Sequence, residues 1–247
     1  MKKIVLLFAL SLTFVTIHAQ DTLNNSNPGS GINNILLKSR PGQHFMLQYT
    51  LDYWRGMPDS ISSHQGGFSR GFGAYFMFDK RFKTSRKLSF GIGAGFSTSN
   101  IFFKKMDLGL NSLTPKLPFT ALDSADHFKK YKLATTYLEI PLELRFTGNP
   151  DNYTKGIRAA LGLKLGTLVN AHTKGKSPVN KDNQSIGSYT EKINSKRFIN
   201  GSRFMATARV GYGVFNITGA YGLSNVLKDG VGPSMKLFEI GLMVSGL

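Results

Sequence analysis

The chain has 247 residues, of which 41% are hydrophobic, and it carries a formal net charge of +17. It contains no cysteine, so disulfides, thiolate metal sites, cysteine nucleophiles and a lipoprotein anchor are excluded. The positive charge does not favour nucleic-acid binding, because the 31 lysines and arginines are spread over separated segments without a recognisable nucleic-acid-binding motif.

The first 19 residues predict a cleavable export signal. Lys2 and Lys3 precede an apolar run over residues 4–15, and the small residue Ala19 follows at the expected cleavage position. The apolar run is too short for a membrane-spanning helix. Residues 20–42 are polar and predict a flexible lead-in on the periplasmic side.

From residue 43 onward, apolar side chains alternate with small or polar ones, which is the period of a β-strand. The alternation predicts eight strands, over residues 44–54, 68–78, 88–98, 137–146, 156–169, 202–212, 217–224 and 236–247. The predicted connections alternate in length, with long loops at 55–67, 99–132, 170–201 and 225–235 and short turns at 79–87, 147–155 and 213–216. Outer-membrane barrels have long loops outside and short turns in the periplasm. The sequence therefore predicts an all-β fold, an eight-stranded antiparallel transmembrane β-barrel over residues 43–247, in the outer membrane with its N-terminus in the periplasm.

The stretch YLEIPLELRF, residues 137–146, combines an apolar face with a charged one. An eight-stranded barrel has an interior just wide enough to be filled by side chains, and charges buried there must be paired. We therefore expect a charge network in the lumen, formed by Glu139, Glu143, Arg145, Arg158, Lys164, Arg209 and Glu239. Pro141 in the same stretch removes a ladder hydrogen bond, so a bulge is expected there.

The stretch 137–146, together with AYGLSNV over residues 220–226, resembles the PorT-like outer-membrane β-barrel family of Bacteroidota. The resemblance covers residues 40–247. It implies a small integral outer-membrane protein that acts as a scaffold or accessory subunit. The founding member of that family is needed for type IX protein secretion, so secretion-system subunits and the barrel-insertion machinery are expected partners. The resemblance supplies no catalytic or binding residue.

Basic residues gather in the second and third predicted outer loops, and Arg203 borders the third. Lipopolysaccharide presents dense negative charge at this level, and it attracts nearby cations. The candidate contacts to outer-membrane lipid and lipopolysaccharide are Lys104, Lys105, Lys129, Lys130, Lys174, Lys176 and Arg197. An alternative function is therefore a stand-alone barrel that binds lipopolysaccharide or an external ligand through these loops. A solute channel is disfavoured, because eight strands leave little lumen.

The histidines do not predict a metal or catalytic site. His44, His64, His127 and His172 fall in separate segments without the spacing of metal ligands. We therefore expect no metal, no cofactor and no catalytic residue. A lipid-modifying enzyme that uses a histidine and a serine near the outer leaflet remains a less favoured alternative.

Overall fold

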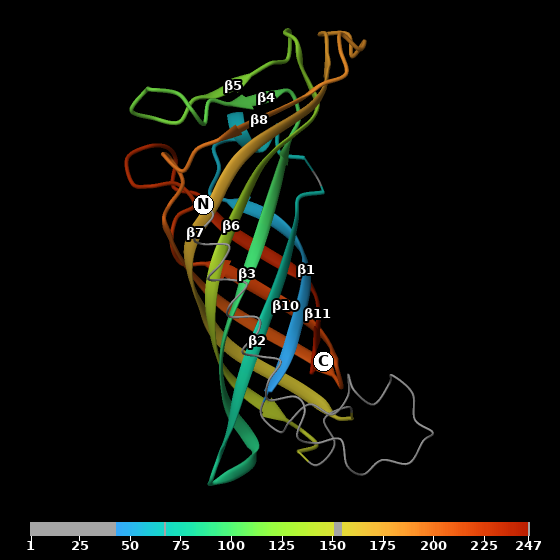
Figure 1. The fold of residues 1–247 in the computed structure, drawn as a ribbon, viewed down its shortest axis with the longest axis vertical. Coiled ribbons are helices and arrows are strands. Elements are labelled where there is room, and N and C mark those ends of the chain that lie inside the picture. The colour runs from blue at the N-terminus through green and yellow to red at the C-terminus, as the bar shows by residue number, and fades with distance from the viewer. Residues whose placement is uncertain (1–42, 67, 151–154, 247) are drawn as a thin grey trace, which may run out of the picture. The chain divides into compact units, whose positions relative to one another are not determined.

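The computed structural model describes residues 43–66, 68–150 and 155–246 of the chain, so the predicted signal 1–19 and lead-in 20–42 lie outside the described residues. Eight antiparallel strands close into a ring (Figure 1). In ring order they are β1 (Gln43–Arg55), β2 (Arg70–Phe82), β3 (Ser85–Phe103), β6 (His127–Thr147), β7 (Ile157–Val179), β9 (Ser202–Tyr212), β10 (Phe215–Gly222) and β11 (Lys236–Ser245). Pairing of β1 with β11 closes the ring. The predicted eight-stranded antiparallel barrel is confirmed.

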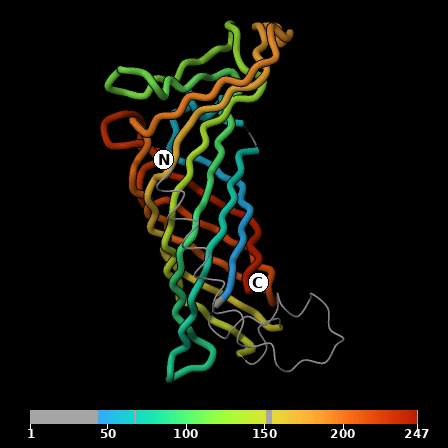
Figure 2. Tube along the Cα trace, in the orientation of Figure 1, coloured from blue at the N-terminus to red at the C-terminus, as the bar shows by residue number. Residues whose placement is uncertain are grey.

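Three strands exceed their predicted lengths by eight residues or more. The strands β3, β6 and β7 run past the others at the end that carries the long loops, as Figures 1 and 2 show. The register between β6 and β7 shifts between Thr136 and Tyr137, where the pairing skips Val169. Beyond this bulge the outward side chains are mostly polar, so apolar alternation no longer marks the strands.

The outward faces of the strands form an apolar belt. Large apolar side chains stay exposed on it, among them Phe90, Leu138, Ile140, Leu161 and Leu242. Outer-membrane barrels carry such a band where they meet lipid. The belt therefore marks the part of the barrel that spans the membrane. In the part of the chain that the structure describes, no helix is both long and apolar enough to cross a membrane.

Pro141 lies on the lumen face of β6 without the expected bulge. Along the described length of β3 and β6, the pairs Ile92–Leu142 and Gly95–Glu139 belong to one register, and the two pairs between them are missing. The predicted bulge at Pro141 is therefore wrong. A local gap in the ladder accommodates the missing N–H of proline, and the strand continues in register.

The connections at the long-loop end fold into an ordered structure that we call the cap. It contains the helix α3 (Asp59–Ser62) and the strands β4 (Met106–Leu108), β5 (Phe119–Ala121) and β8 (Thr190–Asn194). Strand β4 pairs with β5, and β8 pairs with the extension of β7. Figure 1 shows β4, β5 and β8 beyond the end of the ring.

The cap has its own hydrophobic core. Its buried side chains come from all four long connections and pack onto Trp54, Ile101, Leu133 and Leu237 of the barrel. The cap contributes Ile61, Met106, Leu108, Leu110, Leu117, Phe198, Ile199, Leu227 and Met235. The Leu117 amide also donates to the Val231 carbonyl oxygen at 2.8 Å, which joins two of the connections.

Shortening Leu108 tests whether the cap is a packed unit. Leu108 is 0% exposed, so Leu108→Ala should destabilise the cap by about 2–5 kcal/mol. We expect faster trypsin cleavage of the cap in membrane preparations, with an unchanged fraction of heat-modifiable barrel on gels. Leu113→Ala, at a leucine that is 87% exposed, is the control. Equal cleavage rates of the two variants would contradict a packed cap.

Candidate functional site

Charged side chains from several strands meet in the lumen. Near the short turns, the Glu143 carboxylate accepts from Arg145 Nε at 2.7 Å and from Arg209 Nη2 at 3.0 Å. Arg145 Nη1 also lies 3.7 Å from Asp79 Oδ1 and 2.9 Å from His44 Nε2. The Glu143 carboxylate thus bridges two guanidinium groups, and Asp79 places a second negative charge beside Arg145.

A second set of pairs lies farther toward the cap. Lys164 Nζ donates to Glu239 Oε2 at 3.3 Å. The Glu139 carboxylate accepts from the Tyr75 hydroxyl at 2.6 Å and from Arg203 Nε at 3.1 Å. These pairs join side chains from β2, β6, β7, β9 and β11 across the lumen.

The structure places the seven predicted network residues together inside the ring. Six are buried, and Arg158 is half-buried near the short-turn end. The sequence groups Arg203 with the basic residues beside the third outer loop, and this is wrong, because Arg203 is buried and bonded to Glu139. The alternation of β9 could have placed Arg203 in the lumen, because Arg203 shares the inward phase of that strand with Arg209.

Asp52 is a second lumen residue that the sequence reasoning missed. It is 0% exposed and accepts from the Thr50 hydroxyl at 2.6 Å and from the Ser99 hydroxyl at 2.5 Å. Five acidic and five basic side chains lie inside the ring: Asp52, Asp79, Glu139, Glu143 and Glu239, and Arg145, Arg158, Lys164, Arg203 and Arg209. The acids Asp79, Glu139, Glu143 and Glu239 lie within ion-pair distance of cations, as burial of charge requires, and two hydroxyl groups hold Asp52.

Glycines provide the space that the long side chains occupy. A Cβ atom on Gly91 would lie 2.7 Å from Cζ of Arg145, and one on Gly95 would lie 2.6 Å from the Tyr75 ring. Both distances are too short for a real side chain. The glycine-rich inward faces of the strands therefore leave room for the long side chains that fill the lumen.

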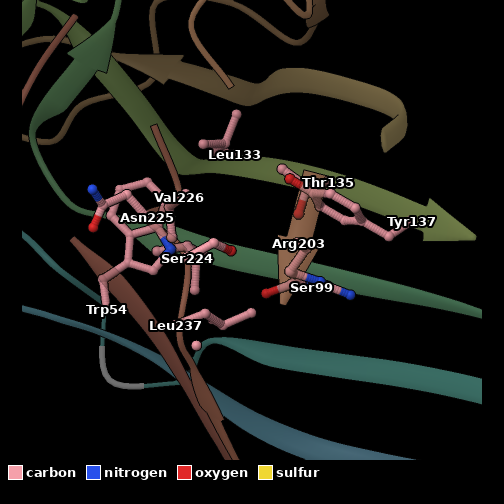
Figure 3. Close-up of a pocket in the computed structure, with 12 residues that line it drawn as sticks. Trp54, Ser99, Leu133, Thr135, Tyr137, Arg203, Ser224, Asn225, Val226 and Leu237 are labelled. Carbon is pink, nitrogen blue, oxygen red and sulfur yellow. The ribbon is translucent and has the colours of Figure 1, made fainter. Parts of the chain in front are cut away.

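Little free space remains between the network and the cap core. A cavity of about 20 Å³ lies there, lined by Trp54, Tyr137, Arg203 and Val226 among others. Figure 3 shows Tyr137 and Arg203 on one side of it, with Trp54 and Val226 on the other. A cavity of this size holds about one water molecule, so it is too small for a solute.

A second charged feature lies on the outside of the extended strands. Four lysines and an aromatic ring line a groove of about 190 Å³, which we call the lysine groove: Phe102, Lys130, Lys132, Lys174 and Lys176. In the register of β6 and β7, Lys130 lies opposite Lys176 and Lys132 lies opposite Lys174. Phe102 on β3 lies opposite Lys132.

The surroundings of the lysine groove are cationic as well. Burial, followed by the charges of Lys174, Arg70 and Lys176, lowers the pKa of Lys132. Burial, followed by the charges of Lys192, Lys132 and Lys174, lowers the pKa of His172. Both shifts arise outside the apolar belt and report the same concentration of positive charge.

The groove gathers three of the seven predicted headgroup contacts, Lys130, Lys174 and Lys176, and adds Lys132. The other four do not line it: Lys104, Lys105, Lys129 and Arg197. Arg197 has a structural role, because its Nη2 donates to the Leu113 carbonyl oxygen at 3.2 Å within the cap.

Among the described residues, His64 is the histidine that lies between a serine and an acidic side chain, as a catalytic histidine would. Its Nδ1 lies 3.1 Å from both the Ser63 hydroxyl and the Ser60 carbonyl oxygen, and its Nε2 lies 3.3 Å from Asp123 Oδ2. A carbonyl oxygen only accepts, so Nδ1 must carry a proton to bond it. In that tautomer Nδ1 cannot accept the proton of Ser63, and this arrangement does not activate the serine. Among the described residues, no group of three or more histidine, aspartate or glutamate side chains could hold a metal ion.

Comparisons with known proteins find one family and several solved structures. A model of the family described as outer membrane protein beta-barrel domain matches residues 19–228. Neisserial surface protein A, a solved structure, is 11% identical with a TM-score of 0.37, over 83% of this chain and 96% of that one. Ail, the attachment invasion locus protein of Yersinia pestis, is 11% identical with a TM-score of 0.34, over 83% and 98%. No curated protein matches the sequence significantly.

Proposed function

Because the chain belongs to the outer membrane protein beta-barrel domain family, we propose that it is a non-enzymatic scaffold or accessory subunit of the outer membrane. In this proposal the long-loop end faces the outside and the N-terminus lies in the periplasm, as in other outer-membrane barrels. The ordered cap then stands where external partners reach it. The finer role is assistance of type IX protein secretion or surface assembly, supported by the resemblance of residues 137–146 to PorT-like barrels.

The observation that carries the scaffold proposal is the closed interior. Ion pairs fill the ring, glycines fit closely around them, and the cap core packs on top. A channel needs a continuous aqueous path, and eight strands leave room only for side chains. A binding or anchoring role therefore agrees best with this geometry.

Planar-bilayer recording tests the closed interior directly. The purified full chain should give no stable unitary conductance steps, because the lumen is filled. Reproducible single-channel steps that disappear after heat unfolding of the sample would contradict the scaffold proposal in favour of a channel.

The secretion role is tested by the secretome and surface proteome of a deletion strain. We expect a whole class of exported proteins to be lost and to return when the intact gene is restored. An unchanged profile, with the barrel present in the parent outer membrane, would reject the secretion role. The lipid A and phospholipid masses of the same strain should not change, and a shifted mass would favour the lipid-modifying enzyme instead.

A further inference from the structure

We infer that the lysine groove binds the phosphorylated saccharide of an outer-leaflet glycolipid. The inference goes beyond the proposed scaffold role and rests on it only for the placement of the long-loop end outside the membrane. It is carried by the arrangement of the lysines, by the aromatic ring beside them and by the height of the groove above the apolar belt.

The lysines are arranged in a way that disfavours folding. Lys130 faces Lys176, Lys132 faces Lys174, and Lys174 also faces Lys192 on β8. Like charges directly opposite each other on neighbouring strands are destabilising. Natural sequences break such local rules mostly at functional sites. A bound polyanion would remove the repulsion, so the cluster has a physical reason to be there.

Phe102 gives the groove a partly apolar wall. Lys132 Nζ lies 5.8 Å from the centre of the Phe102 ring, and Arg70 Cζ lies 5.5 Å from it. Lys132 Nζ also donates to Asn100 Oδ1 at 2.6 Å, which fixes the position of this ammonium group. A ring beside held cations suits a ligand with both a sugar ring and anionic groups.

The groove continues the lipid-facing side of the barrel above the belt. On β6, Lys132 and Lys130 have the same outward phase as Leu138, which is 54% exposed in the belt. The groove therefore opens toward the surrounding leaflet and not toward the barrel mouth. A neighbouring lipid molecule is the ligand that is always present on this side.

The height of the groove selects a glycolipid over a phospholipid. Leu138 is the last exposed large apolar side chain of β6 toward the cap, and it marks the edge of the belt on this strand. From Leu138 to Lys132 the strand covers about 20 Å, or about 15 Å along the membrane normal for a tilt of about 40°. Phospholipid headgroups extend only about 5–8 Å beyond the hydrocarbon core. The charged sugars of a glycolipid continue above that level and reach the lysines.

The test compares two double variants of the purified, detergent-solubilised full chain. Lys130→Gln/Lys176→Gln removes two exposed charges from the groove, and Lys116→Gln/Lys181→Gln removes two exposed charges elsewhere. Binding is measured for lipopolysaccharide truncated to its phosphorylated inner core, for the same material after chemical dephosphorylation, for phosphatidylglycerol and for a polyglutamate peptide. Heat modifiability on gels establishes that each variant is a folded barrel.

We expect the groove variant to bind the phosphorylated lipopolysaccharide about 25-fold more weakly, since a lysine near an anionic surface contributes roughly a factor of five. The dissociation constant of the control variant should stay within about twofold of that of the parent. Dephosphorylation of the lipopolysaccharide should weaken its binding to the parent protein about as much as the two groove substitutions do. Equal losses in both variants, or no loss in the groove variant, would overturn the inference. Groove-dependent binding of phosphatidylglycerol or polyglutamate that is as tight as that of lipopolysaccharide would overturn the choice of a glycolipid. If the groove variant is a heat-modifiable barrel and binds the phosphorylated lipopolysaccharide as tightly as the parent does, the groove ligand is rejected. The proposed scaffold role is not affected by that result.

Discussion

Glu143→Leu should destabilise the barrel by about 3–5 kcal/mol, the usual cost of removing one partner of a buried ion pair. Its carboxylate lies within 3.0 Å of Arg209 Nη2 and 2.7 Å of Arg145 Nε, and leucine offers neither group an acceptor. Urea unfolding in detergent can be followed by the fluorescence of Trp54, the single tryptophan of the chain. The unfolding midpoint should fall clearly below that of the parent.

Glu191→Leu is the matched control for this prediction, because Glu191 is exposed on β8. Its effect should stay within about 0.5 kcal/mol. A second variant, Glu143→Leu with Arg209→Met, should recover part of the lost stability, since replacing a whole buried pair by apolar residues costs less than leaving one ion alone. Equal midpoints for the two single leucine variants would show that Glu143 is not a paired lumen residue.

Leu161→Arg should destabilise the inserted barrel by about 2–4 kcal/mol, the cost of an arginine on the lipid face near the membrane midplane. Leu161 is 68% exposed on β7 within the apolar belt. In an aqueous environment an exposed leucine tolerates a charge easily, so a large effect identifies the surroundings as lipid. Unfolding in lipid vesicles measures the difference.

Leu113→Arg is the control, because Leu113 is 87% exposed in the cap. It should leave both the unfolding midpoint and the yield of folded barrel within error. Similar midpoints for Leu161→Arg and Leu113→Arg would contradict the assignment of the belt to the membrane.

The strands could be predicted because each barrel strand repeats a period of two between lipid and lumen. Their lengths could not, because the extensions of β6 and β7 place residues such as Lys132 and Lys174 where the alternation expects apolar ones. The bulge that skips Val169 also changes the phase of β7 between the belt and the cap. No local pattern in the sequence marks that change.

The lumen network could be predicted from the sequence, whereas the lysine groove and the cap core could not. Glu139, Glu143 and Glu239 stand out in the sequence, because the chain has few glutamates and these three occupy one phase of their strands. The lysine groove depends on which residue of β6 faces which residue of β7, and this requires the register across the bulge. The cap core joins residues as distant as Ile61 and Met235, so only the folded chain brings it together.

The cap core also has a consequence for the order of assembly. Its side chains come from four connections. In the proposed orientation, with the long-loop end outside, each connection crosses the bilayer with its own hairpin before it can pack. The cap can therefore form only after the last hairpin has crossed. Trp54 becomes buried at that step, so its fluorescence follows the completion of the cap. Completion of the cap makes retreat of any single hairpin costly, because its loop would have to leave a shared core. In that orientation the shared core of the cap opposes the return of any single hairpin after insertion.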